Sequence, residues 1–149
     1  MTLRNTLDTH RWIVPVVRLV GLAIFVLAFF EPAVTREGQN YAGWKCASVA
    51  MSFAQNLLTK SGGHHESFEY LGAMSGLINP LIVFALLASP IRALAVLRRI
   101  FGVLVVLCMI ATWALFSQQQ IAPLIGHFLW IAGALIVLAP DAVFGGKQA

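Results

Sequence analysis

The sequence has 149 residues, of which 59% are hydrophobic and 11% are charged, and its formal net charge is +4. Soluble domains contain about 45–50% apolar and about 25% charged residues, and disordered chains are poor in hydrophobic residues, so the composition excludes both classes. Arg98-Arg99 is the only basic doublet, which argues against a nucleic-acid-binding surface. We therefore expect an all-α, polytopic membrane protein that forms a single transmembrane domain over residues 1–149.

Four segments are apolar over roughly the length that a membrane-spanning helix needs, which is about 20 residues. They comprise residues 12–30, 70–89, 100–116 and 121–139. Glu31-Pro32, Ser89-Pro90 and Pro140-Asp141 mark three of their ends, because proline disfavours the continuation of a helix. The sequence therefore predicts four transmembrane helices.

The arginines predict the orientation of these helices, since lysine and arginine are enriched in cytoplasmic loops. Arg4 and Arg11 precede the first segment, and Arg92, Arg98 and Arg99 lie between the second and the third. The short connection between the third and fourth segments contains no basic residue. We expect both termini in the cytoplasm and the loop of residues 31–69 outside.

The loop of residues 31–69 contains a further helical pattern over residues 44–60. Ala47, Met51, Ala54 and Leu58 recur at helical spacing, with polar residues largely on the opposite side. This pattern predicts an amphipathic helix on the outer leaflet, with a fifth span as the alternative. Trp44 at its start is a candidate contact for a ligand or a partner.

Arg18 is a charged residue inside the first apolar segment. Its long side chain can reach the headgroups, or it can face inward and contact a ligand or a partner protein. The four apolar segments contain no acidic residue, so the sequence predicts no charge-paired proton relay.

Asn79-Pro80 lies in the middle of the second apolar segment. Pro80 cannot donate a backbone hydrogen bond and predicts a kink, and Asn79 is expected to bond to a neighbouring helix or to the freed backbone. A substrate or ion site at this break is the alternative, although transporters usually have a pair of such breaks.

Small residues at helical spacing occur in the second and fourth segments. Gly72 and Gly76 are four residues apart, and Gly126 is followed by Gly133 seven residues later. Such positions let two helix backbones approach closely. We interpret them as packing positions, either inside the bundle or against a partner protein.

Three residues could bind a cofactor or a metal. His127 could ligate haem or a pigment, but no other apolar segment contains a second histidine, and a hydrogen-bonded position inside the bundle is favoured. His65 and Glu69 have the four-residue spacing of metal ligands on a helix, but they follow Gly62-Gly63, where a solvated linker is favoured. We expect no cofactor. Since the sequence contains no G-x-S-x-G, H-E-x-x-H or P-loop motif, we also expect no enzymatic activity.

Three motifs resemble those of a loose group of uncharacterised small bacterial inner-membrane proteins. The motifs are Tyr41-Ala42-Gly43-Trp44-Lys45-Cys46, the helix-embedded Asn79-Pro80, and Gly126-His127-Phe128-Leu129-Trp130. The resemblance covers most of the chain. It implies four helices and a bacterial inner membrane, and it implies no activity.

Three hypotheses for the function follow. The leading one is a non-catalytic accessory or structural subunit, with the lipid bilayer and other membrane proteins as its partners. The first alternative is a small receptor or immunity-type protein that recognises an external ligand through residues 31–69. The second alternative is a pigment- or haem-bearing subunit that uses His127.

Overall fold

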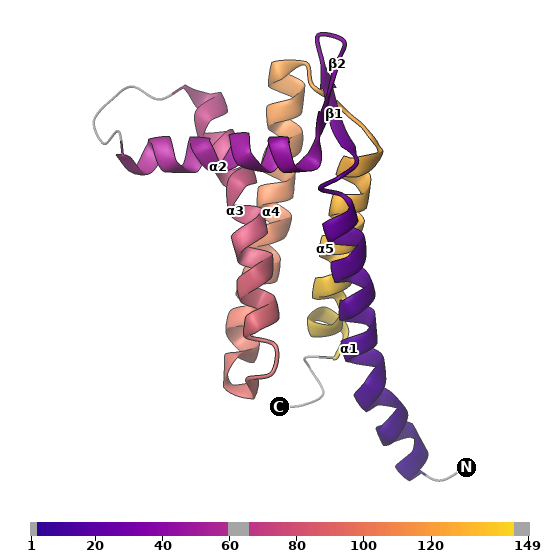
Figure 1. The fold of residues 1–149 in the computed structure, drawn as a ribbon. Coiled ribbons are helices and arrows are strands. Elements are labelled where there is room, and N and C mark those ends of the chain that lie inside the picture. The colour runs from indigo at the N-terminus through magenta and orange to yellow at the C-terminus, as the bar shows by residue number, and fades with distance from the viewer. Residues whose placement is uncertain (1–2, 60–65, 145–149) are drawn as a thin grey trace.

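The computed structural model describes residues 3–59 and 66–144 (Figure 1). These residues form five α-helices, three short β-strands and one 3₁₀ turn. In chain order the elements are α1 (Leu3–Leu27), β1 (Pro32–Arg36), β2 (Gln39–Ala42), α2 (Gly43–Thr59), α3 (Ser67–Leu87), the 3₁₀ turn (Arg92–Leu94), α4 (Ala95–Gln119), β3 (Ala122–Pro123) and α5 (Ile125–Phe144). The expectation of a mostly helical chain is confirmed, and a small sheet is added to it.

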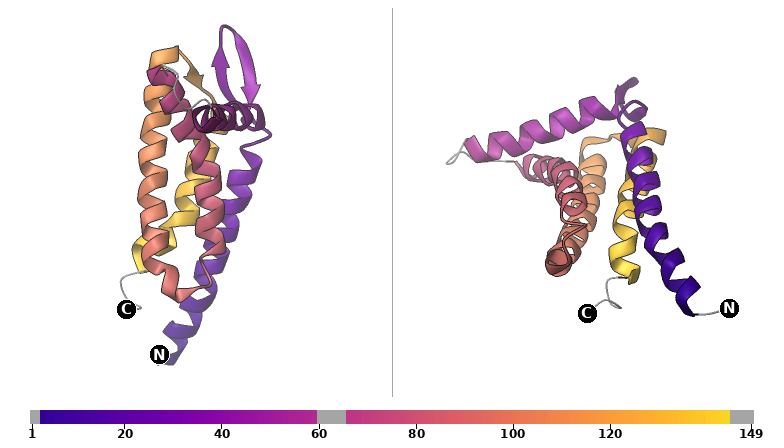
Figure 2. Two further views of the ribbon diagram at one scale, coloured as in Figure 1. Left: turned by 90° about the vertical axis from the view of Figure 1, so that its left-hand side faces the viewer. Right: turned by 60° about the horizontal axis from the view of Figure 1, so that its bottom comes forward.

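The four long helices form two antiparallel pairs, α1 with α5 and α3 with α4 (Figure 1). Each pair packs along its length, whereas the contact between the pairs is much smaller. Helix α2 runs crosswise over the long helices and packs on α3 (Figure 2). We call the end with α2 and the sheet the outer end, and the end with the start of α1, the α3–α4 turn and the end of α5 the inner end.

The core lies where the two helix pairs meet below α2. Its largest fully buried side chains are Ile78 and Ile82 of α3, Val105 of α4 and Val137 of α5. Phe25 of α1 belongs to the same cluster, so all four long helices contribute to it. Close packing of these apolar side chains holds the two pairs together.

The outward faces of the helices are also apolar. Large apolar side chains such as Val83 and Phe84 of α3 and Val103 and Ile110 of α4 are exposed. Helices that are apolar on every side belong in the core of a large protein or in a membrane. By length and composition, α3 and α4 could each cross a membrane.

The other two predicted spans are shorter apolar helices in the described residues, Ile13–Leu27 and Ile125–Pro140. Of the four predicted spans, the structure therefore supports two, α3 and α4.

The loop of residues 31–69 contains the predicted helix, α2, with bounds one residue earlier than expected at each end. Its crosswise direction differs from that of the long helices, which does not fit the alternative of a fifth span (Figures 1 and 2). Its inner face packs on glycines of α3. A Cβ atom at Gly76 would lie 2.5 Å from the carbonyl oxygen of Ala50, so α2 and α3 approach closely.

The sheet was not predicted from the sequence. Strands β1 and β2 form an antiparallel hairpin in which Thr35 pairs with Asn40, and β3 pairs antiparallel with the other edge of β1. Glu37 and Gly38 connect the hairpin strands with positive φ angles of 53° and 76°. Two positive φ angles are typical of the type I′ turn that suits the twist of a hairpin. The sheet ties the loop after α1 to the α4–α5 connection.

Candidate functional site

A cavity of about 360 Å³ lies between α2 and the hairpin on one side and α3, α4 and α5 on the other. Its volume is within the range of about 300–1,000 Å³ that is common for small-ligand sites. Most of its surface is apolar, with side chains such as Phe29, Phe53 and Phe116 in the lining. The region that the sequence predicts to face outward therefore covers a space of ligand size.

Asn79 and Trp130 form the polar contact furthest from the outer end of this cavity. The Nε1–H group of Trp130 in α5 donates to Oδ1 of Asn79 in α3 over 3.1 Å, which confirms the predicted interhelical bond of Asn79. A carboxamide also has two N–H donors. Within residues 3–59 and 66–144 these donors have no hydrogen-bond partner, and Asn79 lines the cavity. Asn79 can therefore donate to a bound molecule.

One stripe of α3 faces the cavity. Gly72, Ser75 and Asn79 all line it, and their spacing places them on one side of the helix. A Cβ atom at Gly72 would lie 2.5 Å from the Phe53 ring, so the glycine admits this aromatic side chain of α2. Helix α3 continues from Ser67 to Leu87 through Pro80, which leaves this stripe intact. The stripe thus combines one close-packing position with two hydrogen-bonding side chains.

His127 lies in the lining and is only 5% exposed. Four aromatic rings surround its imidazole, with centroid distances of 5.6 Å to Trp113, 4.8 Å to Phe116, 6.1 Å to Phe128 and 5.6 Å to Trp130. Its Nε2 atom is buried and has no hydrogen-bond partner in the described part of the chain. The sequence predicts a hydrogen-bonded histidine inside the bundle. At Nε2 no such bond is found among the described residues, and aromatic rings surround the imidazole.

The burial of the His127 imidazole affects the hypothesis that this residue ligates haem or a pigment. An imidazole that ligates a cofactor needs a nitrogen that faces open space. Nε2 of His127 is enclosed by the protein, so the geometry gives no support to ligation through this atom. The pigment-bearing function stays an untested prediction.

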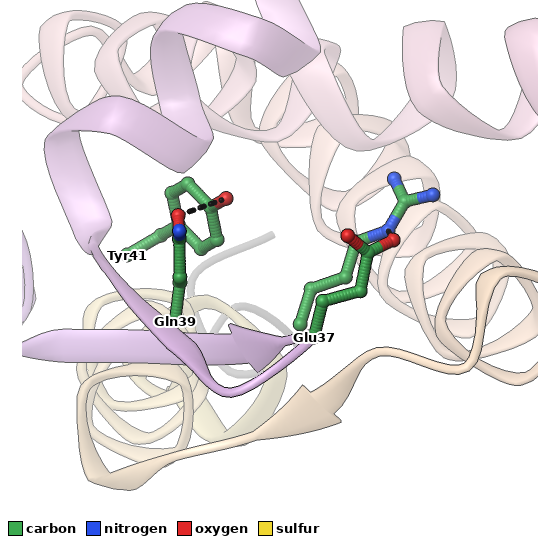
Figure 3. Close-up of polar contacts among 4 residues, drawn as sticks. Glu37, Gln39 and Tyr41 are labelled. Carbon is green, nitrogen blue, oxygen red and sulfur yellow. Dashed lines mark hydrogen bonds and ion pairs between the residues drawn. The ribbon is translucent and has the colours of Figure 1, made fainter.

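The rim of the cavity is cationic. Arg36 and Lys45 line it, and both residues are exposed. The Nε atom of Arg36 lies 3.6 Å from Oε1 of Glu37, and the hydroxyl of Tyr41 donates to Oε1 of Gln39 over 3.2 Å (Figure 3). Exposed pairs of this kind contribute little to stability, so these side chains can rearrange around a ligand.

Cys46 of α2 also lines the cavity. Its Sγ–H group points to the carbonyl oxygen of Tyr41 at 4.0 Å, and burial raises the pKa of the thiol above its ordinary value. Cys46 and Cys108 are both free thiols. Because the thiolate is the reactive form, Cys46 is a weak nucleophile at neutral pH.

The predicted metal ligands do not form a site among the described residues. His65 lies outside them. The Oε2 atom of Glu69 accepts a hydrogen bond from the backbone N–H of Glu66 over 3.2 Å, which caps the start of α3. No group of three or more His, Cys, Asp or Glu residues in residues 3–59 and 66–144 could hold a metal ion.

Two further predicted contact residues lie away from the cavity lining. Arg18 is half-buried in α1 and has an interaction partner, so it is not an isolated charge. Trp44 is 54% exposed, and the Nζ atom of Lys45 lies 5.5 Å from its ring. The ligand or partner contacts predicted for these two residues stay predictions.

The predicted packing glycines all contact other parts of this chain. In addition to Gly72 and Gly76 against α2, Gly126 faces the carbonyl oxygen of Pro32 and Gly133 faces the backbone of Phe25, where added Cβ atoms would lie 2.8 Å and 2.5 Å away. Their role in packing inside the bundle is therefore observed.

Sequence reasoning missed several residues of the cavity. Ser75 has a signal in the sequence, because it lies one helical turn before Asn79. Thr112 and Trp130 are polar or amphipathic side chains in apolar segments, and Thr112 donates to the carbonyl oxygen of Cys108 over 2.9 Å. Arg36 had no such signal, because its place at the rim depends on the unpredicted hairpin.

No protein-family model, curated protein sequence or solved structure matches this chain. The resemblance to small bacterial inner-membrane proteins therefore stays a prediction.

Proposed function

We propose that this protein is a non-catalytic integral membrane protein that binds a small, largely apolar molecule beneath α2. The cavity under the loop of residues 31–69 is the observation that carries this proposal. Its apolar lining suits an apolar body, and Asn79 and Ser75 suit a hydrogen-bond acceptor such as a carbonyl group. This is the receptor hypothesis from the sequence, with the external ligand bound below the loop.

We also propose that four helices cross the membrane: α3 and α4, and in addition α1 and α5. Helix α5 has 20 residues, and at about 1.5 Å per residue it is about as long as the hydrocarbon layer is thick. Arg98 and Arg99 lie at the inner end, so we place this end and both termini at the cytoplasmic side of a bacterial inner membrane.

The accessory-subunit hypothesis is less well supported. It rests on the absence of catalytic motifs and on the many close-packing positions, which could contact partner proteins through glycine-bearing or lipid-facing helix faces. Gly72, Gly76, Gly126 and Gly133 are instead in contact with α2, Pro32 and α1 of the same chain. The remaining exposed apolar surface needs only lipid to cover it.

A matched pair of variants tests the proposed function. Ala47 of α2 lines the cavity, whereas its neighbour Ser48 is exposed and does not. Ala47→Phe should fill the cavity, and Ser48→Phe should add the same bulk outside it. Each protein is purified from membranes in mild detergent, and the molecules that co-purify are extracted and identified by mass spectrometry.

We expect the wild type and Ser48→Phe to retain the same small molecule and Ala47→Phe to lose it. A molecule retained equally by Ala47→Phe would contradict the proposal, as would an extract identical to that of membranes without the protein. The thermal unfolding midpoints of both variants are measured first, so that loss of folding is recognised.

A further inference from the structure

A second hollow, which we call the inner groove, lies between α4 and α5 towards the inner end. Its volume is about 600 Å³. Its walls are Gly102, Val103, Val106 and Leu107 of α4 and Leu135, Leu138 and Ala139 of α5, and Arg98 and Arg99 complete its lining. An almost wholly apolar groove thus has two guanidinium groups at the end where α4 begins.

The inner groove is open to the surroundings along its side. Val103, Leu107 and Leu135 are 62%, 48% and 45% exposed. Leu107 lies eight residues after Arg99, which is about 12 Å along the helix. The groove is therefore a channel on the surface of the helix bundle, long enough to hold a stretch of hydrocarbon chain.

Gly102 shows that the chain itself leaves this space empty. A Cβ atom at Gly102 would have no heavy atom of a neighbouring side chain or helix within 4 Å, unlike one at Gly133, which would meet backbone at 2.5 Å. Glycine weakens a helix interior, and packing within the chain does not require it here. Gly102 lies one turn from both Arg98 and Val106, so it widens the groove directly beside the cationic end.

Arg98 is held in place at this end. Its Nη1 atom donates to the carbonyl oxygens of Ala88 and Ile91, over 3.0 and 2.8 Å. These bonds fix the guanidinium beside the turn that connects α3 with α4. Arg99 is exposed next to it. The positive charge is therefore located at one end of the groove rather than spread along it.

We propose that the inner groove binds an anionic phospholipid, with one acyl chain along α4 and α5 and the phosphate beside Arg98 and Arg99. The inference rests on the membrane placement proposed above and not on the cavity beneath α2. An apolar groove alone would accept any lipid chain. The guanidinium groups add the preference for an anionic headgroup, because they bind phosphate with charge-assisted hydrogen bonds.

Native mass spectrometry of the full chain in a neutral detergent tests this proposal. Phosphatidylglycerol and phosphatidylcholine with the same acyl chains are titrated separately. We expect phosphatidylglycerol to bind about tenfold more tightly. Arg99→Gln should reduce its binding to nearly that of phosphatidylcholine. Gly102→Leu should weaken the binding of both lipids, because its side chain would occupy the groove.

Ala114→Leu is the control, because Ala114 is an exposed residue of α4 outside the groove, and we expect it to bind both lipids like the wild type. Equal affinity of the wild type for both lipids, or wild-type binding by Gly102→Leu, would overturn the proposal. Loss of a co-purifying protein rather than a lipid in Gly102→Leu would assign the groove to a partner helix and would also overturn it.

Alkaline carbonate extraction of membranes shows whether the lipid site alone is wrong or whether the proposed membrane placement is wrong. A protein that stays in the membrane but shows no lipid preference refutes only the lipid site. A protein that carbonate releases refutes the placement on which both proposals depend.

Discussion

The two ends of the helix bundle are built differently from the same four long helices. Towards the inner end, apolar side chains such as Ile82 and Val105 pack without exposed surface. Beneath α2, the same helices surround a mostly apolar cavity whose lining includes Asn79, Thr112 and His127. The packed core therefore holds the two helix pairs together, and the outer end surrounds a mostly apolar cavity.

The sheet and α2 explain how the outer end keeps this space. Strand β1 pairs with both β2 and β3, and the backbone N–H of Leu124 donates to the carbonyl oxygen of Ala33 over 2.8 Å. Close contact at Gly76 holds α2 on α3. The sheet and α2 therefore contact both helix pairs. Substitutions in the core should mainly lower stability, and substitutions in the cavity lining should mainly change binding.

The largest expected effect is on the stability of the core. Ile82→Ala should lower the free energy of unfolding by about 2 kcal/mol, near the low end of the about 2–5 kcal/mol found for such truncations. The low end is expected because lipid chains are as apolar as isoleucine and reduce the transfer contribution. Thermal unfolding in mild detergent measures the change.

The neighbouring exposed residue Val83 provides the control for this prediction. Val83→Ala should change the free energy of unfolding by less than about 0.5 kcal/mol. Equal losses in Ile82→Ala and Val83→Ala would show that the core does not hold the two pairs together as described.

A smaller effect is expected for the hydrogen bond at the far end of the cavity. A double-mutant cycle with Asn79→Ala and Trp130→Phe should give a coupling energy of about 0.6 kcal/mol, and at most about 1.7 kcal/mol. Unfolding of the four proteins in detergent measures it. A coupling energy of zero would mean that the bond between Asn79 and Trp130 is not formed in the folded protein.

The Asn79→Ala variant also separates binding from stability. Loss of the carboxamide donors should reduce the amount of co-purifying molecule more than Val83→Ala does, although the cost in stability is small. An unchanged amount of bound molecule would exclude Asn79 from the binding site.

The smallest effect concerns the pH dependence of Cys46. Burial raises the pKa of its thiol in the folded protein above the unfolded value. The contribution of this group to the free energy of unfolding is therefore fully present below the unfolded pKa. It is lost as the pH rises through the folded pKa. In a Cys108→Ala background, the rate of alkylation by iodoacetamide should rise with pH along a curve whose midpoint is above the ordinary cysteine value.

Alkylation of Cys46 can also be compared with and without a molecule bound in the cavity. The molecule identified by co-purification, added back to protein freed of it, should slow alkylation of Cys46, since this residue lines the cavity. A midpoint at the ordinary cysteine pKa would contradict the burial of the thiol, and unchanged alkylation with the molecule present would place it elsewhere.

The helices could be predicted because each depends on properties of a continuous segment. Apolar length identified α3 and α4, and periodic spacing identified α2 within one residue at each end. The interhelical bond of Asn79 was also predictable, because a carboxamide in an apolar segment needs a partner.

The sheet and the cavity could not be predicted for physical reasons. Strand β3 has only two residues, one of them Pro123, and its pairing with β1 joins segments far apart in the sequence. The turn of the hairpin places Glu37, a residue without a glycine's freedom, at a positive φ angle. The cavity arises from the way α2 and the hairpin lie over α3, α4 and α5, which no single segment encodes.

Binding beneath α2 can be observed directly in an experimental structure of the protein in lipid nanodiscs that contain native membrane lipids. We expect density for a small molecule beneath α2, with a polar atom about 2.7–3.2 Å from the carboxamide of Asn79 or the hydroxyl of Ser75. A cavity closed by the side chains of α2, or one that contains only water, would contradict it.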